Sequence, residues 1–319
     1  MSLVNMKCTY CGELLQDEST RCASICPHCG RPFITKEAVR YAENPDFEIR
    51  CGELIKYTGT ETDVELPSFV ISIGDNAFAN YERLKRIVIP ESVKKIGAFA
   101  FSKCTGLEEL VLPNGIERIS YGAFSGCISL TSVTIPAARI GDCAFSDCAG
   151  LESVTILDGV TKIGSNAFSE CKNLKSVTLP EYMFDPIGDC AFSGCTSLTD
   201  IRLPDGLGHI SCRMFCDCTS LKSIEIPDSE LSFAVDSSAF ERCTSLEHIA
   251  LPAGTLMIGE RSFLGCKSLK SVRLPRGLRE VRKDAFKGCT NLESISLFPV
   301  RSLRELRASL REKLKNMEI

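Results

Sequence analysis

A pattern of about 23 residues recurs ten times along the 319-residue chain and constrains its fold more than any other feature. Every copy places a Leu six residues after a Phe, Ile, Leu or Val at nine and eleven residues after it, and Ile or Val five residues before it. Those Phe residues are Phe78, Phe101, Phe124, Phe145, Phe168, Phe192, Phe215, Phe240, Phe263 and Phe286. Such regularity predicts an array of equivalent structural units.

The physical properties of one unit indicate how the units associate. The segment from the Leu to the second Ile or Val predicts a short strand with alternate side chains facing inward. Eight copies then have Pro, which cannot donate to a strand ladder and so ends the strand. Because one unit cannot bury its own apolar face, neighbours must stack. We therefore predict a repeat solenoid over residues 61–298, with ten full repeats and one partial repeat at Val64–Pro67.

The repeats resemble a known family. Units such as the segment Ala123–Pro136, with the sequence AFSGCISLTSVTIP, are similar to the BspA-like, Treponema-pallidum-type leucine-rich repeats. The resemblance covers residues 61–298. It implies a curved leucine-rich-repeat array with a parallel β-sheet on the concave face. It also implies a protein that binds other macromolecules, since members are often surface or secreted proteins.

A column of cysteines follows the Phe residues at a distance of three positions. Its nine members are Cys104, Cys127, Cys148, Cys171, Cys195, Cys218, Cys243, Cys266 and Cys289. One interpretation is a metal or redox ladder, and the other is a column of small buried thiols that fill one interior position per coil. We favour packing, because one equivalent thiol per layer forms a stack and not a tetrahedron of ligands.

Two Cys-x-x-Cys-Gly motifs near the N-terminus predict a metal site. Cys8 and Cys11 form the first pair, and Cys26 and Cys29 form the second. Two facing pairs supply four thiolates, which suits tetrahedral zinc. We predict a zinc ribbon over residues 1–35 that holds one structural Zn²⁺ per chain, similar to small bacterial zinc ribbons. An iron site and a dithiol redox pair are the alternatives.

The segments that flank the repeats have the character of caps. Residues 36–60 are predicted to be a linker and N-terminal cap that contains a short helix at Lys36–Glu43 and a strand at Glu53–Tyr57. Residues 299–319 carry Leu side chains along one helical stripe. We predict a C-terminal capping helix there, with a membrane-surface or partner-binding helix as the alternative.

The outward positions of the predicted strands indicate a candidate binding surface. The third to fifth repeats place only Ser and Thr there, whereas later repeats place charged side chains of both signs. The candidate partner-binding residues are Asp200, Arg202, Glu225, His248 and Arg273. An ordinary solvated face is the alternative interpretation. Two enlarged loops, one with Tyr182, Met183 and Phe184 and one with Phe233, either mark contact sites or pack under themselves.

Composition and motifs narrow the function. The net charge of −4 provides no electrostatic basis for strong nucleic-acid binding. The chain contains no phosphate-binding loop, no zinc-protease motif and no nucleophile elbow. We predict a non-catalytic protein-interaction module or scaffold that binds a protein or peptide, with the zinc ribbon as a second docking element. An exported cell-surface adhesin and a zinc-dependent nucleic-acid-binding regulator are the alternatives.

The N-terminal sequence bears on where the protein resides. The first residues contain no apolar core typical of a secretory signal, and the sequence contains no apolar run long enough to span a membrane. We therefore expect a cytoplasmic protein whose 19 cysteines stay reduced. A cell-surface location is expected instead if an export signal was removed.

Overall fold

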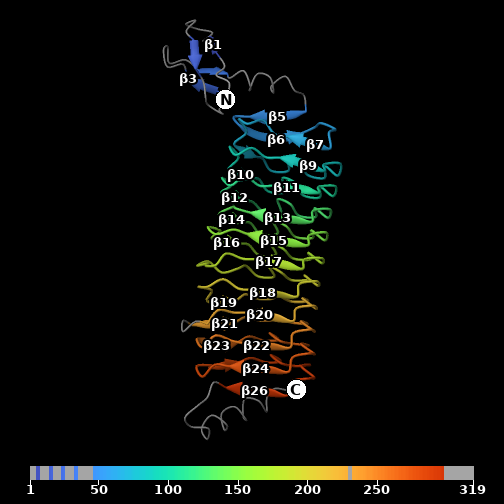
Figure 1. Ribbon diagram of the computed structural model, residues 1–319, viewed down its shortest axis with the longest axis vertical. Coiled ribbons are helices and arrows are strands. Elements are labelled where there is room, and N and C mark those ends of the chain that lie inside the picture. Colours follow the sequence, from blue (N-terminus) through green and yellow to red (C-terminus); the bar gives the residue numbers. More distant parts are fainter. Residues whose placement is uncertain are drawn as a thin grey trace.

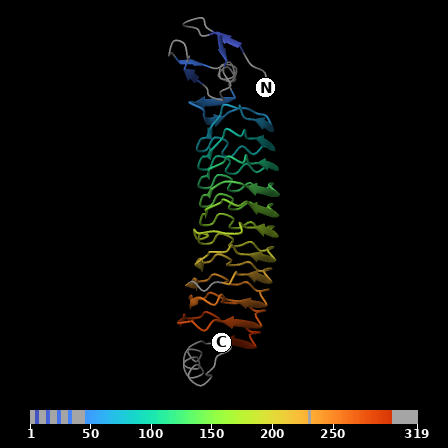
Figure 2. The same ribbon diagram turned by 60° about the vertical axis from the view of Figure 1, so that its left-hand side comes forward.

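The chain forms a solenoid of stacked coils, as the repeat predicts. The computed structural model describes residues 46–228 and 232–297, together with four strand segments nearer the N-terminus. Figures 1 and 2 show the coils stacked into a long column that bends only slightly in either view. Each coil contributes parallel strands to two different sides of the column, and we name the sides by these strands.

The first side, the long-strand face, carries the strands that follow each invariant Leu. These strands are β7 (Asp63–Glu65), β9 (Arg86–Val88), β11 (Glu109–Val111), β13 (Ser132–Ile135), β15 (Ser153–Ile156), β17 (Ser176–Thr178), β18 (Asp200–Arg202), β20 (Ser223–Glu225), β22 (His248–Ala250), β24 (Ser271–Leu274) and β26 (Ser294–Leu297). Equivalent residues lie side by side, for example Val133 beside Val154. The predicted alternation is confirmed, since Ile87 is buried between the exposed Arg86 and Val88.

The second side, the short-strand face, carries strands that contain the Ile or Val before each Phe. They are β8 (Ser72–Ile73), β10 (Lys95–Ile96), β12 (Arg118–Ile119), β14 (Arg139–Ile140), β16 (Lys162–Ile163), β19 (His209–Ile210), β21 (Phe233–Val235), β23 (Thr255–Ile258) and β25 (Glu280–Val281). The pairing weakens between β16 and β19, where Ile187 forms only an isolated bridge to Ile163. This interruption coincides with the enlarged loop after Pro180.

An uninterrupted stack of Phe rings fills the core. All ten Phe side chains of the repeats are at most 2% exposed. Successive rings lie 4.9–5.8 Å apart between centroids and are nearly parallel, with interplanar angles of 1–13°. The N-terminal end of the stack is continued by Tyr57, whose ring centroid lies 5.0 Å from that of Phe78. Tyr57 ends β6 (Glu53–Tyr57), the strand predicted from the sequence, and β5 (Phe47–Arg50) pairs with it antiparallel.

The cysteine column packs beside the Phe stack, which confirms the packing interpretation. All nine thiols are free and at most 1% exposed. Each thiol also donates a hydrogen bond to the carbonyl oxygen of the Phe one coil earlier, with donor–acceptor distances of 3.0–3.2 Å. The thiol therefore links one coil to the previous one by a hydrogen bond, a role that the sequence pattern did not predict.

A turn with two left-handed residues surrounds every Phe. Asn166 and Glu170, two positions before and after Phe168, have φ angles of 56° and 59°. The N–H groups of these two residues and of Phe168 donate to carbonyls of the next coil at 2.8–2.9 Å. In all ten repeats, the residues two positions before and two positions after the Phe have positive φ angles, and they are as different as Gly, Lys, Cys and Phe. The hydrogen bonds between coils thus stabilise a backbone conformation that most of these residue types rarely adopt.

Nearer the N-terminus, the structure describes only four short strands. Strand β1 (Asn5–Lys7) pairs antiparallel with β2 (Leu14–Gln16), and β3 (Ala23–Ile25) pairs antiparallel with β4 (Pro32–Ile34). The predicted zinc ligands, the helix predicted at 36–43 and the helix predicted at 301–319 lie outside the described residues.

The buried thiols predict that stability declines at alkaline pH. Burial raises the pKa of Cys171, Cys195 and Cys243 well above the ordinary value, and that of Cys104 to about 12. Below the unfolded thiol pKa of about 8.5, both states hold the proton and stability is unaffected. Above it, only the unfolded chain releases protons, so each such thiol should lower the free energy of unfolding by about 1.4 kcal/mol per pH unit.

Urea unfolding between about pH 8 and 10 measures this slope. The variant Cys171→Ala should flatten the slope by the contribution of one thiol. A wild-type slope near zero would contradict the prediction.

Candidate functional site

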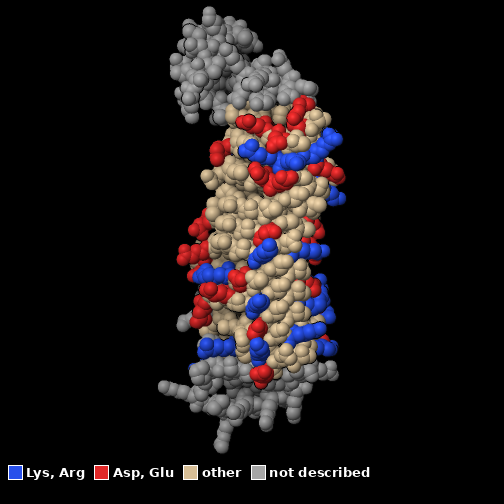
Figure 3. All heavy atoms as spheres, turned by 45° about the vertical axis from the view of Figure 1, so that its right-hand side comes forward, with Lys and Arg blue, Asp and Glu red and all other residues tan. Residues whose placement is uncertain are grey.

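The structure brings the predicted partner-binding residues onto neighbouring strands of the long-strand face. Asp200 and Arg202 lie on β18, Glu225 on β20, His248 on β22 and Arg273 on β24. We call these five residues the polar strip. Figure 3 shows red and blue side chains close together in the lower half of the column and an uncharged stretch above them. The strip extends over successive coils, with β18 paired to β20 and β22 paired to β24, and its role in binding is a prediction.

Contacts within the strip hold two of its side chains in place. Arg202 donates from Nε to Oε1 of Glu225 at 3.1 Å, and its Nη2 donates to Oδ1 of Asp205 at 3.0 Å. His248 Nδ1 lies 2.8 Å from the Ser271 hydroxyl oxygen. These side chains are exposed, so each ion pair contributes little to stability. Their contribution is to orient Arg202, whose partner Asp205 lies beyond the strand end.

Asp205 connects the strip to a cleft at the enlarged loop after Pro180. The cleft has a volume of about 720 Å³. One extra residue lengthens this loop, and the three side chains at its tip point in different directions. Met183 is 1% exposed and anchors the loop in the core, whereas Tyr182 is 50% and Phe184 84% exposed. The two aromatic rings contact each other edge to face, with centroids 4.7 Å apart.

Backbone geometry supports the ring of Tyr182. Gly206 has a φ of +89°, and a Cβ atom there would lie 2.7 Å from Cζ of Tyr182 and 2.8 Å from the carbonyl oxygen of Met183. Only glycine accommodates both the left-handed conformation and the close approach of the ring. Tyr182 and Asp205 also form an isolated bridge between neighbouring coils. The aromatic tip therefore rests on a fixed support.

The walls of the cleft are charged. Carboxylates of Asp158, Glu181, Asp185 and Asp205 line it, and Arg139 is the cation among the lining residues. Asp158 accepts the backbone N–H of Glu181 at 3.1 Å, which ties the loop to the preceding coil. The cleft therefore combines two exposed aromatic rings, of a type enriched at protein interfaces, with an acidic wall.

The second enlarged loop behaves differently. Phe233 is 3% exposed and belongs to β21, so its side chain lies in the core and does not form an exposed contact site. Loop length alone therefore located both irregular coils but did not distinguish the exposed aromatic side chains from the buried one.

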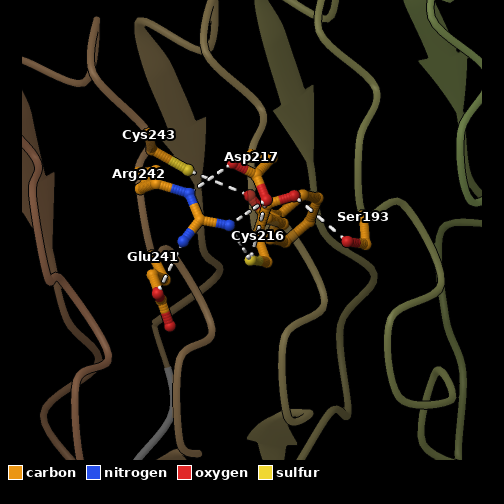
Figure 4. A network of polar contacts seen from close by, with 7 residues as sticks. Ser193, Cys216, Asp217, Glu241, Arg242 and Cys243 are labelled. Carbon is orange, nitrogen blue, oxygen red and sulfur yellow. Dashed lines mark hydrogen bonds and ion pairs between the residues drawn. The ribbon is translucent and has the colours of Figure 1, made fainter.

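A partly exposed polar network lies in the turns between the seventh and eighth repeats (Figure 4). Arg242 donates to both carboxylate oxygens of Asp217 at 2.5 Å and to Glu241, whose side chain is 6% exposed, at 2.9 Å. The guanidinium lowers the pKa of Asp217 through these hydrogen bonds. Cys216 lies beside them, but burial and the hydrogen bond to Asp217 raise its thiol pKa to about 12.

This network connects the turns of neighbouring coils, and its thiol is not activated. A reactive cysteine requires a lowered thiol pKa, and the environment of Cys216 acts in the opposite direction. Within residues 46–228 and 232–297, no three His, Cys, Asp or Glu residues come together as metal ligands. The predicted zinc ligands Cys8, Cys11, Cys26 and Cys29 are not among the described residues.

Sequence analysis did not identify several residues that form the cleft. Asp158, Glu181 and Asp205 occupy the same repeat position, one residue after the strand-ending position. This shared position is the sequence signal from which their grouping could have been predicted. Arg139, on a neighbouring short strand, had no such signal. Their grouping depends on how the lengthened loop folds over the previous coil.

Comparisons with known proteins agree with the repeat architecture. A family model described as a BspA type leucine rich repeat region matches residues 56–139, 138–234 and 233–318. No curated protein matches the chain.

Three solved structures are similar to the chain. A leucine-rich repeat protein from Bacteroides ovatus shares 26% identity, with 76% of this chain and 82% of that chain covered and a TM-score of 0.38. A leucine rich cell surface protein from Faecalibacterium prausnitzii shares 24% identity, with 78% and 91% covered and a TM-score of 0.44. The leucine-rich repeat protein of T. pallidum shares 24% identity, with 82% and 86% covered and a TM-score of 0.30.

Two substitutions at the tip of the enlarged loop should distinguish a side chain that stabilises the fold from one that is exposed to solvent. Met183→Ala should lower the free energy of unfolding by about 2–5 kcal/mol, because it removes a buried side chain and leaves a cavity. Phe184→Ala should change it by less than about 0.5 kcal/mol, because the ring is solvent-exposed. Chemical denaturation measures both. Equal losses from the two variants would show that Phe184 serves the fold and not the surface.

Proposed function

The chain belongs to the family of BspA-type leucine-rich repeat regions, and we propose that it is a non-catalytic module that binds a protein or peptide partner through its solenoid surface. Leucine-rich-repeat solenoids of this type are generally interaction proteins. A rigid stack of coils presents a long surface without an enclosed pocket for chemistry. The proposal is that the polar strip and the adjoining cleft form one binding surface.

The exposure of Phe184 is the observation that carries this proposal. An aromatic ring that is 84% exposed, held by the anchored Met183, gains stability only when a partner covers it. The ion pair from Arg202 to Asp205 joins this aromatic tip to the polar strip. An aromatic anchor surrounded by oriented polar groups is the composition of an interface hot spot.

We also propose that the N-terminal segment holds a structural zinc ion as a second docking element. The sequence places Cys8 and Cys11 in the interval between β1 and β2, and Cys26 and Cys29 in the interval between β3 and β4. Each interval thus follows one strand of an antiparallel pair and precedes the other. Four thiolates in two such pairs suit tetrahedral zinc, which would stabilise a segment too short to fold on an apolar core alone.

The free thiols support a reducing compartment, and we propose the cytoplasm. All fourteen cysteines among the described residues are free, and disulfides are rare where glutathione keeps thiols reduced. No helix among the described residues is long and apolar enough to cross a membrane. The exported cell-surface adhesin is the alternative, and thiol titration of protein isolated from its source cell distinguishes the two.

The binding proposal is tested by comparing variants in affinity capture from the source cell. Phe184→Ala should lose the partner, because the aromatic anchor is removed, and Arg202→Ala with Arg273→Ala should weaken its retention. Ile128→Ala, which truncates a half-exposed apolar side chain on another coil, and Ser153→Ala serve as controls. Quantitative mass spectrometry of the captured proteins is the measurement. If all variants retain the same proteins as the wild type, the proposed surface is wrong.

The zinc proposal is tested by elemental analysis of purified protein. About one zinc ion per chain is expected, and Cys11→Ser should abolish its retention because three thiolates bind the ion more weakly. Cys51→Ser, at an exposed cysteine outside the two motifs, should retain it. Removal of the ion by a chelator should leave the melting of the solenoid unchanged, because each repeat contacts only its neighbours. A metal-free protein from zinc-replete cells would refute the proposal.

A further inference from the structure

Charges that face each other across the strands of the solenoid generally alternate in sign. On the long-strand face, Arg86 lies between Asp63 and Glu109, and its Nε is 3.5 Å from the Glu109 carboxylate. Further along, Arg202 faces Glu225. The adjacent row of side chains follows the same rule, with Glu152 bound to Lys175 at 2.9 Å and Glu247 bound to Lys270 at 2.5 Å. Opposite charges on neighbouring coils stabilise the stack, and like charges would destabilise it.

One row on the short-strand face departs from this rule. Lys95, Arg118, Arg139 and Lys162 lie directly beside one another on β10, β12, β14 and β16. We call these four residues the cationic row. All four side chains are exposed. None of them forms an ion pair or a side-chain hydrogen bond with any of the residues that the structure describes in this part of the chain.

The position of this row makes it a surface feature and not a requirement of the fold. The neighbouring residue on each strand is the buried Ile of the repeat, which packs in the core whatever precedes it. Other repeats have Ser, Pro, His, Ala, Met or Glu at the position of the row. A neutral or alternating row would therefore serve the solenoid equally well, and four like charges in register have no structural benefit.

The size of the row limits what can bind it. With a strand spacing of about 4.8 Å, four coils extend over about 14 Å. Acidic side chains also lie nearby, since Glu117 precedes Arg118 and Asp142 follows Arg139, and the whole chain has a net charge of −4. A long polyanion would therefore encounter repulsion along most of the column. A short anionic segment would meet mainly the row, with the cleft carboxylates Asp158, Glu181, Asp185 and Asp205 beside Arg139.

We propose that the cationic row docks an extended acidic segment of a partner protein. In such a segment, side chains on one face recur about every 6.6 Å, so two or three carboxylates match the length of the row. Arg118 and Arg139 can each receive a carboxylate in a two-point contact, and Lys95 and Lys162 act as flexible point charges at the two ends. This inference goes beyond the proposed function, because it names a second face and the chemistry of its partner.

Two variants of matched type test the assignment. Arg118 and Arg86 are exposed strand arginines in neighbouring repeats, but Arg86 is paired and Arg118 is not. Arg118→Glu should raise the melting temperature, because it creates opposite charges beside Lys95 and Arg139. Arg86→Glu should lower it, because the new carboxylate faces Asp63 and Glu109.

The binding probe is a short fluorescent peptide of alternating Glu and Ser, with Gln in place of Glu as its neutral counterpart. At low salt, the acidic peptide should bind the full chain and the neutral one should not. Arg118→Gln should weaken binding about fivefold or more, and Arg118→Glu about tenfold or more, whereas Arg86→Gln should leave it unchanged. Added salt should weaken binding of the wild type.

Several results would overturn the inference. Equal losses from Arg118→Gln and Arg86→Gln would show that net charge and not the row attracts the peptide. Binding of a heparin fragment or a single-stranded oligonucleotide that depends on Arg118, without binding of the peptide, would assign the row to another class of partner. Because Phe184→Ala does not alter the row, loss of peptide binding in that variant would also contradict a separate site. The affinity-capture experiment with Phe184→Ala and the peptide-binding experiment are independent, so a failure to capture a partner would not change the results expected for the peptide.

Discussion

The Phe ring of each coil stacks on the Phe ring of the previous coil. The cysteine thiol of the coil also donates a hydrogen bond to the backbone carbonyl of that previous Phe. Cys127, for example, donates to the carbonyl of Phe101, which also accepts the backbone N–H of Cys104. These contacts work only when successive coils are in register, because the ring, the thiol and the carbonyl lie at fixed positions of the repeat. Register in turn decides which outward side chains become neighbours. The surface of this protein is therefore a set of rows, one for each outward position of the repeat.

Rows explain why the two candidate surfaces differ in origin. On the regular coils, a surface is made by residues at equivalent repeat positions, one position in the cationic row and two in the polar strip. The cleft arises instead where one additional residue disturbs the repeat, so that Met183 turns inward and Tyr182 and Phe184 turn outward. The fold tolerates the irregularity because the Phe stack continues through it, with Phe168 and Phe192 still 5.6 Å apart. The cleft is thus a deviation from the repeat that the core can accommodate.

Much of the fold could be predicted because inward positions are chemically restricted. Phe, Cys, Leu and Ile recur where the core requires them, so the strands of the long-strand face, their alternation and the buried thiols followed from spacing alone. The strands of the short-strand face were not predicted, because only the Ile or Val before each Phe marks them. The left-handed turns could not be predicted, since Asn166, Cys190 and Arg213 share one backbone conformation but no side-chain property. Of the candidate site, the polar strip followed from strand alternation. The cleft did not, because pattern alone does not tell which side of a lengthened loop Met183 and Phe184 face.

The same logic explains how one chain can present separate surfaces without conflict. The polar strip and the cationic row lie on strands of different sheets, and each strand contributes its inward residue to a shared core. A substitution at an outward position therefore changes the electrostatic field of one face without altering the stacking that supports the other. Arg139 is the exception, since it belongs to the cationic row and also lines the cleft. Its guanidinium therefore contributes to the electrostatic field of both the cationic row and the cleft, so a substitution of Arg139 changes two surfaces at once.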